Sequence, residues 1–306
     1  MIYKNSMKLL TSNFNLVWKQ LAYTLLRLLI VVGLTVLVSK PILDLLASNG
    51  FTQSLAHLWE SVYTNTLSFF PALKETIVLF VSILSQNMAH IWYSILLFFF
   101  VTVIINAFLK HVGKYTLTYV AHQNFTSLTK CGYSHSLVSN LAQIVRYALS
   151  RLVLDLPFTA VKLIFIFAYC QILNNWVIAI VGITLLIILN TIAYALQITA
   201  YNNLAVEQIT KRSNPFKSAF KTFKSQKGFS KVFSNAIVTV LTIIVVNTII
   251  GIFTVGAGLF ITIPASMALV VIFELVSYYT VTQQRYYLSP TIIVDTTVAG
   301  KTEKIQ

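Results

Sequence analysis

Long apolar stretches alternate with shorter polar or basic segments along the chain. A helix needs roughly 20 mostly apolar residues to cross about 30 Å of hydrocarbon. Six stretches meet this requirement, and they cover residues 21–38, 91–109, 152–170, 176–197, 236–255 and 258–280. The pattern therefore predicts an all-α, polytopic membrane protein in which residues 1–306 form a single integral membrane domain with six transmembrane helices.

The second apolar stretch has an ambiguous beginning. Residues 76–109 are apolar almost throughout, with a polar interruption at Ser85, Gln86, Asn87 and His90. That length indicates either a long helix that protrudes from the bilayer or a short re-entrant segment before the span.

The composition agrees with a membrane protein. Of the 306 residues, 57% are hydrophobic and 10% are charged, whereas a soluble domain carries about 25% charged residues. Such a chain cannot cover a water-facing surface. The first span resembles a signal sequence, but Lys40 and Pro41 follow it in place of a small-residue cleavage site, so we expect it to stay uncleaved.

The basic residues indicate the orientation. The net charge is +14, from 22 Lys and Arg against 8 Asp and Glu. Eighteen of the basic residues fall outside the spans in residues 1–20, 110–151, 198–235 and 281–306, whereas residues 39–90 hold two. Because basic residues collect on the cytoplasmic side of membrane proteins, we expect both termini and the segments 110–151, 198–235 and 281–306 to be cytoplasmic. Residues 39–90 are then extracytoplasmic, and the location is a bacterial cytoplasmic (inner) membrane.

The segment before the fifth span predicts a basic amphipathic helix. Asn214 suits an N-cap and Pro215 the first helical position, and Gly228 is expected to end the helix. The phenylalanines at 216, 220 and 223 recur at helical spacing, and the lysines that follow them are Lys217, Lys221, Lys224 and Lys227. Such a helix lies in the interface, where its lysines contact anionic headgroups. The alternative is that these lysines only set the topology.

Similar segments precede other spans. Residues 136–151 are amphipathic and lead into the hairpin of spans three and four, and residues 9–18 carry an apolar stripe before the first span. The plan predicts two or three parallel copies of a basic amphipathic segment followed by a helical hairpin. On the outer side, the apolar spacing in residues 52–69 indicates an interfacial helix or a plain linker.

Ionisable residues within spans are costly and therefore mark candidate functional positions. Arg27 and Glu274 lie at matched depth, which permits an ion pair between spans one and six. Asp155 follows Arg151 by four residues, the spacing of a local helical pair. Lys162 lies near the midplane of span three.

A polar strip could line a transport path or a headgroup site. Its members are Asp155, Lys162, Asn190, Asn247 and Glu274. In the alternative reading Lys162 snorkels toward the interface or pairs inside the bundle, and the asparagines hold helices together.

Catalytic and cofactor signals are weak. The five histidines are scattered, and although His111 and His122 could meet on one helical face, no carboxylate or cysteine completes a metal-ligand set. No GxSxG, HExxH or phosphate-loop motif is present. We expect no catalytic residues, no metal and no cofactor, and no nucleic acid as a partner.

The last third of the chain resembles a known pattern. It combines residues 215–221 (PFKSAFK) before a span, residues 254–264 (TVGAGLFITIP) opening the final span, and Tyr278 and Tyr279 near its end. This segment, residues 214–287, is similar to the YciC-type bacterial inner-membrane proteins and to the related membrane domain attached to some glycerophosphodiester phosphodiesterases. The resemblance implies about six spans and basic amphipathic segments. The phosphodiesterase catalytic domain has no counterpart here, so no activity carries over.

Together these patterns favour a non-enzymatic, multi-pass membrane protein. We expect it to interact with membrane lipids, through anionic headgroups at the cytoplasmic face, or with a membrane protein complex. The alternative is a transporter or permease subunit for a small molecule or lipid that uses the polar strip. An intramembrane enzyme is the third possibility.

Overall fold

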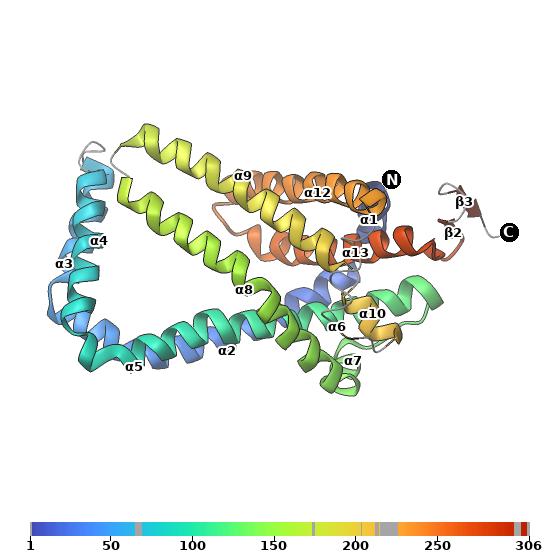
Figure 1. Ribbon diagram of the computed structural model, residues 1–306, viewed down its shortest axis with the longest axis horizontal. Helices are drawn as coiled ribbons and strands as arrows, with labels where there is room; N and C mark the ends of the chain where they lie inside the picture. Colours follow the sequence, from blue (N-terminus) through green and yellow to red (C-terminus); the bar gives the residue numbers. More distant parts are fainter. Residues whose placement is uncertain are drawn as a thin grey trace. The chain divides into compact units, whose positions relative to one another are not determined.

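The computed structural model describes residues 2–64, 69–172, 175–202, 204–211, 214, 226–296 and 301–304. Its helices are α1 (Ile2–Ser12), α2 (Asn15–Ser48), α3 (Phe51–Thr64), α4 (Phe69–Gln86), α5 (Met88–Phe99), the π-helix η1 (Phe100–Ile105), α6 (Asn106–Ser127), α7 (Tyr133–Ser139), α8 (Leu141–Ile172), α9 (Trp176–Tyr201), α10 (Leu204–Lys211), α12 (Gln226–Phe253) and α13 (Leu259–Thr282). Three short strands follow, β1 (Tyr286–Ser289), β2 (Ile292–Asp295) and β3 (Lys301–Lys304). The all-α prediction is confirmed (Figure 1).

Six helical segments within the described residues are long and apolar enough to cross a membrane. They are Asn15–Ser48, Phe69–Gln86, Met88–Ser127, Trp176–Ile209, Phe229–Phe253 and Leu259–Thr282. The multi-pass prediction is confirmed, but the set differs from the predicted one. Phe69–Gln86 falls in the segment assigned to the outside, while α8, which contains the predicted third span as continuous helix, is not among the six.

The apolar stretch 76–109 is neither one protruding helix nor a simple span. Helix α4 ends at Gln86 and α5 begins at Met88, with Asn87 between them. The Asn87 side-chain amide donates a hydrogen bond of 2.9 Å to the Ile83 carbonyl, which satisfies a terminal acceptor of α4. Beyond η1, α6 continues to Ser127, well past the predicted end of the span at Leu109.

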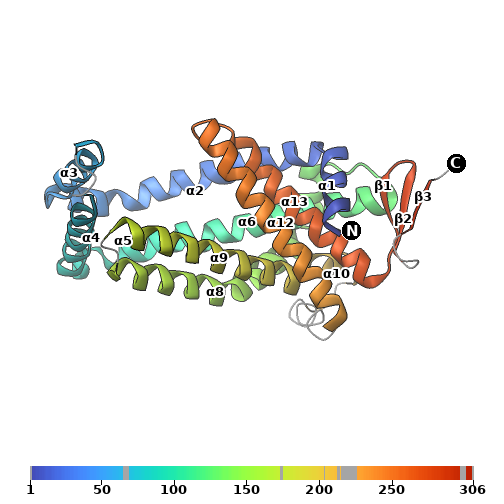
Figure 2. The ribbon, with the colours of Figure 1, turned by 90° about the horizontal axis from the view of Figure 1, so that it is seen from above.

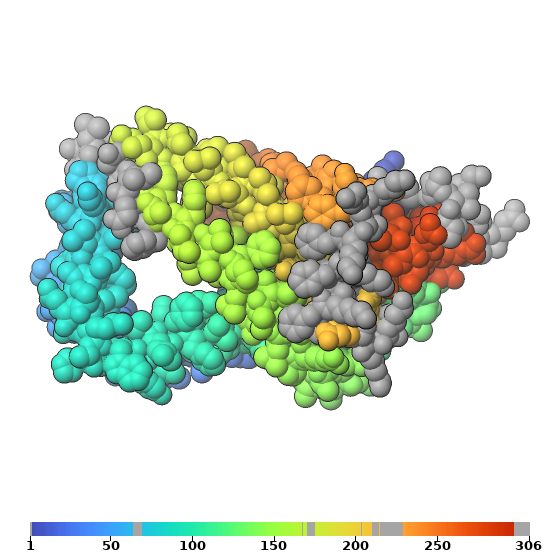
Figure 3. Space-filling model, in the orientation of Figure 1, coloured from blue at the N-terminus to red at the C-terminus, as the bar shows by residue number. Residues whose placement is uncertain are grey.

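Large apolar side chains are exposed along the candidate spans. Leu37 on α2 is 75% exposed and Val177 on α9 is 70% exposed. Many others follow along α8 and α9, whose surfaces are drawn green and yellow in Figure 3. A soluble protein rarely exposes large contiguous apolar patches, so these surfaces fit contact with lipid.

The chain forms two compact units. Unit 1 comprises residues 1–27, 108–156 and 190–306, and unit 2 comprises residues 28–107 and 157–189. Helices α2, α6, α8 and α9 each pass from one unit to the other. The single integral membrane domain predicted from the sequence stays a prediction.

Unit 2 contains helices α3 and α4, which pack against each other. The hydroxyl groups of Ser54 and Thr76 are hydrogen bonded at 2.8 Å, and the rings of Phe51 and Phe80 are 5.6 Å apart. A helix therefore forms in most of residues 52–69, where a helix or a linker was expected. Its position at a membrane interface stays a prediction.

The core of unit 1 is built around α13. Every residue from Ala268 to Tyr279 is buried, as expected of a helix that is apolar on all sides. Helices α1 and α12 pack against it, and Figures 1 and 2 show α12 and α13 side by side as a hairpin. The turn between them carries Val255 and Gly256 with positive φ, which allows the tight reversal predicted here.

A small sheet follows α13. Strands β1, β2 and β3 pair antiparallel in that order, as Figure 2 shows near the C-terminus. Arg285 Nη2 lies 2.6 Å from Asp295 Oδ2. The Tyr286 hydroxyl accepts a hydrogen bond of 2.8 Å from the Asn5 amide, and burial raises the pKa of Tyr286 to about 12 although that hydrogen bond lowers it. This contact joins β1 to α1.

Most of the predicted basic amphipathic helix lies outside the described residues. Lys217, Lys221 and Lys224 belong to that part of the chain. Helix α12 begins at Gln226 and contains both Lys227 and Gly228. The expectation that Gly228 ends a helix is therefore wrong, because the apolar span that follows continues the helix through the glycine.

Candidate functional site

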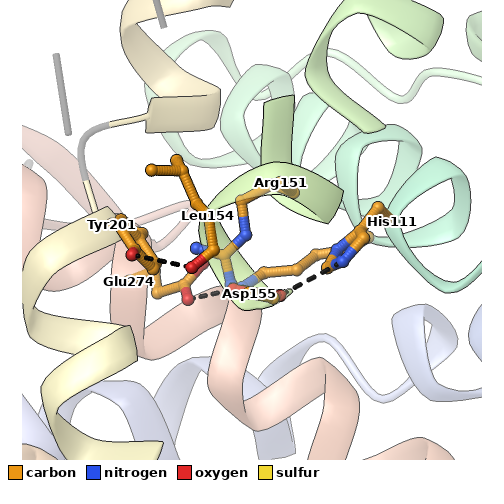
Figure 4. A network of polar contacts seen from close by, with 7 residues as sticks. His111, Arg151, Leu154, Asp155, Tyr201 and Glu274 are labelled. Carbon is orange, nitrogen blue, oxygen red and sulfur yellow. Dashed lines mark hydrogen bonds and ion pairs between the residues drawn. The ribbon is translucent and has the colours of Figure 1, made fainter. Parts of the chain in front are cut away.

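Unit 1 holds a group of buried polar side chains that come from four helices. We call it the buried charge cluster, and its members are His111, Lys114, Arg151, Asp155, Tyr201 and Glu274. Figure 4 shows how His111, Arg151, Asp155, Tyr201 and Glu274 approach one another from α6, α8, α9 and α13. The group lies in helical segments, where ionisable side chains are costly unless they are paired.

The first pair joins α6 to α13. Lys114 Nζ lies 2.5 Å from Glu274 Oε1, and the two side chains are 15% and 4% exposed. A charge buried this deeply is tolerated when an opposite charge compensates it. Each of the two residues therefore depends on the other.

The second group is centred on Asp155 of α8. Arg151 Nη2 lies 3.2 Å from Asp155 Oδ1, and His111 Nε2 lies 3.2 Å from Asp155 Oδ2. The Arg151 guanidinium also stacks 4.2 Å from the centre of the Tyr201 ring, and the Tyr201 hydroxyl donates a hydrogen bond of 3.3 Å to the Leu154 carbonyl. These contacts tie α6 and α9 to α8.

The cluster is balanced in charge. Lys114 and Arg151 are matched by Asp155 and Glu274, so no additional ion is required for neutrality. Arg151 Nε, Arg151 Nη1 and His111 Nδ1 have no hydrogen-bond partner among the described residues. These contacts can hold four helices together. The nitrogen atoms without a partner remain available to hydrogen bond with water or a ligand.

The sequence predictions for these residues have mixed outcomes. The local pair between Arg151 and Asp155 is confirmed. The expected pair between Arg27 and Glu274 is wrong, because Glu274 pairs with Lys114 instead. Arg27 is half-buried on α2.

The structure does not assemble the predicted polar strip in unit 1. Lys162 belongs to unit 2, while the other four members belong to unit 1. Asn247 donates a hydrogen bond of 2.9 Å to the Ser266 hydroxyl and so links α12 to α13, in agreement with the alternative reading. Asn190 is exposed on α9. Only Asp155 and Glu274 enter the cluster.

Sequence reasoning missed His111, Lys114 and Tyr201. The segment after Leu109 was assigned to the cytoplasmic side, outside the predicted span, and in the structure it continues as α6. The available signal was the i, i+3 spacing of His111 and Lys114, which places both on one helical face. His122, the other histidine on this helix, bonds through Nδ1 to the Tyr279 hydroxyl at 2.7 Å.

A second polar feature of unit 1 is a cavity of about 360 Å³, which we call the amide–lysine pocket. It lies where α2 begins, where α6 ends, and at the turn between β1 and β2. Its polar lining is formed by Ser12, Asn13, Asn15, Lys19, Asn124, Thr129, Lys130 and Ser289. Its apolar lining includes Leu16, Val120, Phe125, Leu128 and Leu288.

Hydrogen bonds hold one wall of the pocket in place. The Asn124 amide donates a hydrogen bond of 2.7 Å to Asn13 Oδ1. The Asn13 amide in turn donates a hydrogen bond of 3.0 Å to the Leu9 carbonyl. Lys19 Nζ donates a hydrogen bond of 3.2 Å to the Cys131 carbonyl. The polar groups are therefore ordered before any ligand arrives.

The pocket is positively charged. Lys19 and Lys130 line it and no Asp or Glu does. Nearby on α2, Trp18 is 53% exposed and packs edge to face with Phe14, their ring centres 6.3 Å apart. Exposed tryptophans of this kind are enriched at membrane interfaces.

Comparison of the chain with protein-family models, with curated proteins and with solved structures finds no match.

Proposed function

We propose that this chain is a non-enzymatic, multi-pass protein of a bacterial cytoplasmic membrane that binds anionic lipid headgroups at its cytoplasmic face. The single observation that carries the proposal is the amide–lysine pocket, which combines two lysines, ordered amides and an apolar wall. Its volume of about 360 Å³ lies in the range of small-ligand sites, about 300–1,000 Å³.

The location of the pocket supports a lipid as its occupant. The start of the candidate span Asn15–Ser48, the end of Met88–Ser127 and the hairpin after Leu259–Thr282 all contribute to its lining. The distribution of basic residues assigns these three ends to the cytoplasmic side. We infer that this pocket, at the predicted cytoplasmic ends of these helices, faces the headgroup region.

Electrostatics favour an anion over a zwitterion. A lysine near the membrane surface contributes about 1 kcal/mol of attraction to anionic lipid, and the pocket has two. Lys217, Lys221, Lys224 and Lys227 would add a second basic contact if their segment forms the predicted interfacial helix. The resemblance of residues 214–287 to the YciC-type proteins stays a proposal and brings no activity with it.

The test compares the full-length protein with a variant that carries Lys19→Gln and Lys130→Gln. Binding of anionic and zwitterionic lipid is measured by native mass spectrometry from detergent at low salt. We expect the variant to lose about thirtyfold in affinity for the anionic lipid, because two lysine contacts of about 1 kcal/mol each are removed. Affinity for the zwitterionic lipid should hardly change.

The matched control carries Lys4→Gln and Lys8→Gln, which remove two exposed lysines of α1 outside the pocket. It has the same net charge as the pocket variant, so it separates local binding from general attraction. Equal losses in both variants would show that the pocket is not the binding site.

A second candidate function, transport of a small molecule or lipid, is favoured by the buried charge cluster. Charged residues inside helical bundles often belong to transport paths. Glu274→Gln removes one carboxylate of the cluster, and Lys162→Leu removes the midplane lysine. If both variants are expressed normally and leave growth and uptake unchanged, transport through these residues is excluded.

A further inference from the structure

We infer that the amide–lysine pocket selects a headgroup that carries hydroxyl groups beside its phosphate, a polyol phosphate, over a bare phosphate or a headgroup with an ammonium. The inference rests on the proposed function and names the class of ligand. It depends on residues other than the two lysines, so it can fail while lipid binding stands.

The lining contains more neutral polar groups than one phosphate needs. Besides Lys19 and Lys130 it includes the amides Asn13, Asn15 and Asn124. Amides donate and accept hydrogen bonds, as hydroxyl groups also do. A lysine ammonium only donates, so it suits phosphate oxygens and cannot accept from a hydroxyl.

Asn124 supplies the acceptor. One of the two N–H groups of its amide is already used, because it donates a hydrogen bond of 2.7 Å to Asn13 Oδ1. That contact fixes the orientation of the side chain and leaves the Asn124 carbonyl oxygen for a donor in the pocket. A headgroup hydroxyl is such a donor, whereas an ionised phosphate oxygen is not.

Asn15, the first residue of α2, also lines the pocket. Its side chain is exposed and makes no hydrogen bond within the described residues. It lies four residues before Lys19, so both are on one face of the helix. A ligand whose phosphate contacts Lys19 can therefore place a hydroxyl beside Asn15.

The lining disfavours a headgroup with an ammonium. A buried or half-buried cation is stabilised by a carboxylate, and no Asp or Glu of the described part of the chain lines the pocket. Lys19 and Lys130 repel a third cation. The lining thus favours a phospholipid whose phosphate carries a hydroxyl-bearing glycerol over one with a bare phosphate, and favours both over an aminophospholipid.

The experiment titrates the full-length protein in detergent with short-chain phosphatidylglycerol, phosphatidic acid and phosphatidylethanolamine. Phosphatidic acid bears at least as much negative charge as phosphatidylglycerol, so charge alone does not favour the glycerol headgroup. We expect phosphatidylglycerol to bind about tenfold more tightly, as one or two well-formed hydrogen bonds would provide. Phosphatidylethanolamine should bind most weakly.

Variants then assign the preference to residues. Asn124→Ala should reduce phosphatidylglycerol binding to the level of phosphatidic acid and leave phosphatidic acid unchanged. Asn15→Ala should reduce the preference in the same direction, and because Asn15 is exposed this variant does not threaten the fold. The variant with Lys19→Gln and Lys130→Gln should weaken both anionic lipids equally.

The outcomes separate the two proposals. Equal binding of the two anionic lipids, with no effect of Asn15→Ala or Asn124→Ala, would overturn the hydroxyl inference while lipid binding stands. Loss of all discrimination against phosphatidylethanolamine, with lysine variants that bind like the unaltered protein, would overturn the proposed function. Inorganic phosphate and glycerol 3-phosphate are titrated as soluble probes. If glycerol 3-phosphate binds as tightly as the lipid, the hydroxyl inference is retained and the lipid assignment is overturned.

Discussion

Lys114 Nζ lies 2.5 Å from Glu274 Oε1, and this contact joins residues that are 160 positions apart in the sequence. One turn earlier on the same helix, His111 Nε2 lies 3.2 Å from Asp155 Oδ2. Helix α6 is therefore fastened to α13 by one side chain and to α8 by another. Neither attachment was predicted, because residues 110–151 were assigned to a cytoplasmic segment outside the spans.

The first prediction concerns the loss of one partner of the pair. Glu274→Leu or Lys114→Met leaves the other charge buried without compensation, which costs about 3–5 kcal/mol of unfolding free energy. The double variant removes both charges and should recover most of this loss. Thermal unfolding in detergent, arranged as a double-mutant cycle, measures the coupling.

Glu75→Gln serves as the control for that cycle, because Glu75 is exposed on α4. It should change the unfolding free energy by less than about 0.5 kcal/mol. Strictly additive effects of the two cluster variants would contradict a direct pair between Lys114 and Glu274.

The membrane class was predictable because hydropathy depends on local composition alone. What the sequence did not reveal is where helices continue beyond their apolar part. Helix α6 carries Lys110, His111 and Lys114 just after the predicted end of a span, so a hydropathy window ends there. Its contacts with α13, between Lys114 and Glu274 and between His122 and Tyr279, join residues far apart in the sequence, and such tertiary contacts have no local signal.

The cluster was predictable only in its local part. Arg151 and Asp155 are four residues apart and recognisable from spacing. Arg27 was considered as the partner of Glu274 because both lie at a similar predicted depth from the cytoplasmic face. That depth alone did not distinguish Arg27 from Lys114. The partner of Glu274 depends on which helix packs beside α13. Which helices pack together depends on the fit of their apolar faces, and a single sequence does not show which fit is best.

The second prediction concerns close packing of α6 against α2. A Cβ at Gly113 would collide with the ring of Tyr23, whose hydroxyl donates 2.6 Å to the Leu109 carbonyl. Gly113→Ala should therefore destabilise the protein by about 1–3 kcal/mol, the typical cost of overpacking. Thermal unfolding in detergent measures the effect.

Gly33→Ala is the matched substitution, since a Cβ at Gly33 meets nothing within 4 Å. It should be neutral or stabilise by up to about 1 kcal/mol, because alanine is the better helix former. If both variants behave alike, Tyr23 does not pack on Gly113 as described.

The third prediction tests Asn247 as a link between helices. Asn247→Leu removes the hydrogen bond to Ser266, and interhelical hydrogen bonds in membranes average about 0.6 kcal/mol, with a maximum near about 1.7. We expect a loss of unfolding free energy in that range. Asn190→Leu, at an exposed position on α9, should cost nothing measurable, and a larger loss there would point to a partner for Asn190.

The last prediction concerns whether α4 crosses the membrane. Residues 69–86 are apolar enough to span, yet α4 packs against α3 through a polar contact between Ser54 and Thr76. Helix α3 carries His57 and Glu60, which would be costly in hydrocarbon. We therefore expect both the start of α3 and the end of α4 to lie on the extracytoplasmic side of the membrane.

Cysteine labelling in intact cells measures this. Cys131 and Cys170 are first replaced by serine, and single cysteines are then introduced at Ser48, before α3, and at Ser85, near the end of α4. Both should react with an impermeant maleimide, while a cysteine at Ser225 should react only after the cells are opened. Protection of the cysteine at Ser85, with reaction at Ser48, would mean that α4 spans the bilayer, and the segments after it would then have the opposite orientation.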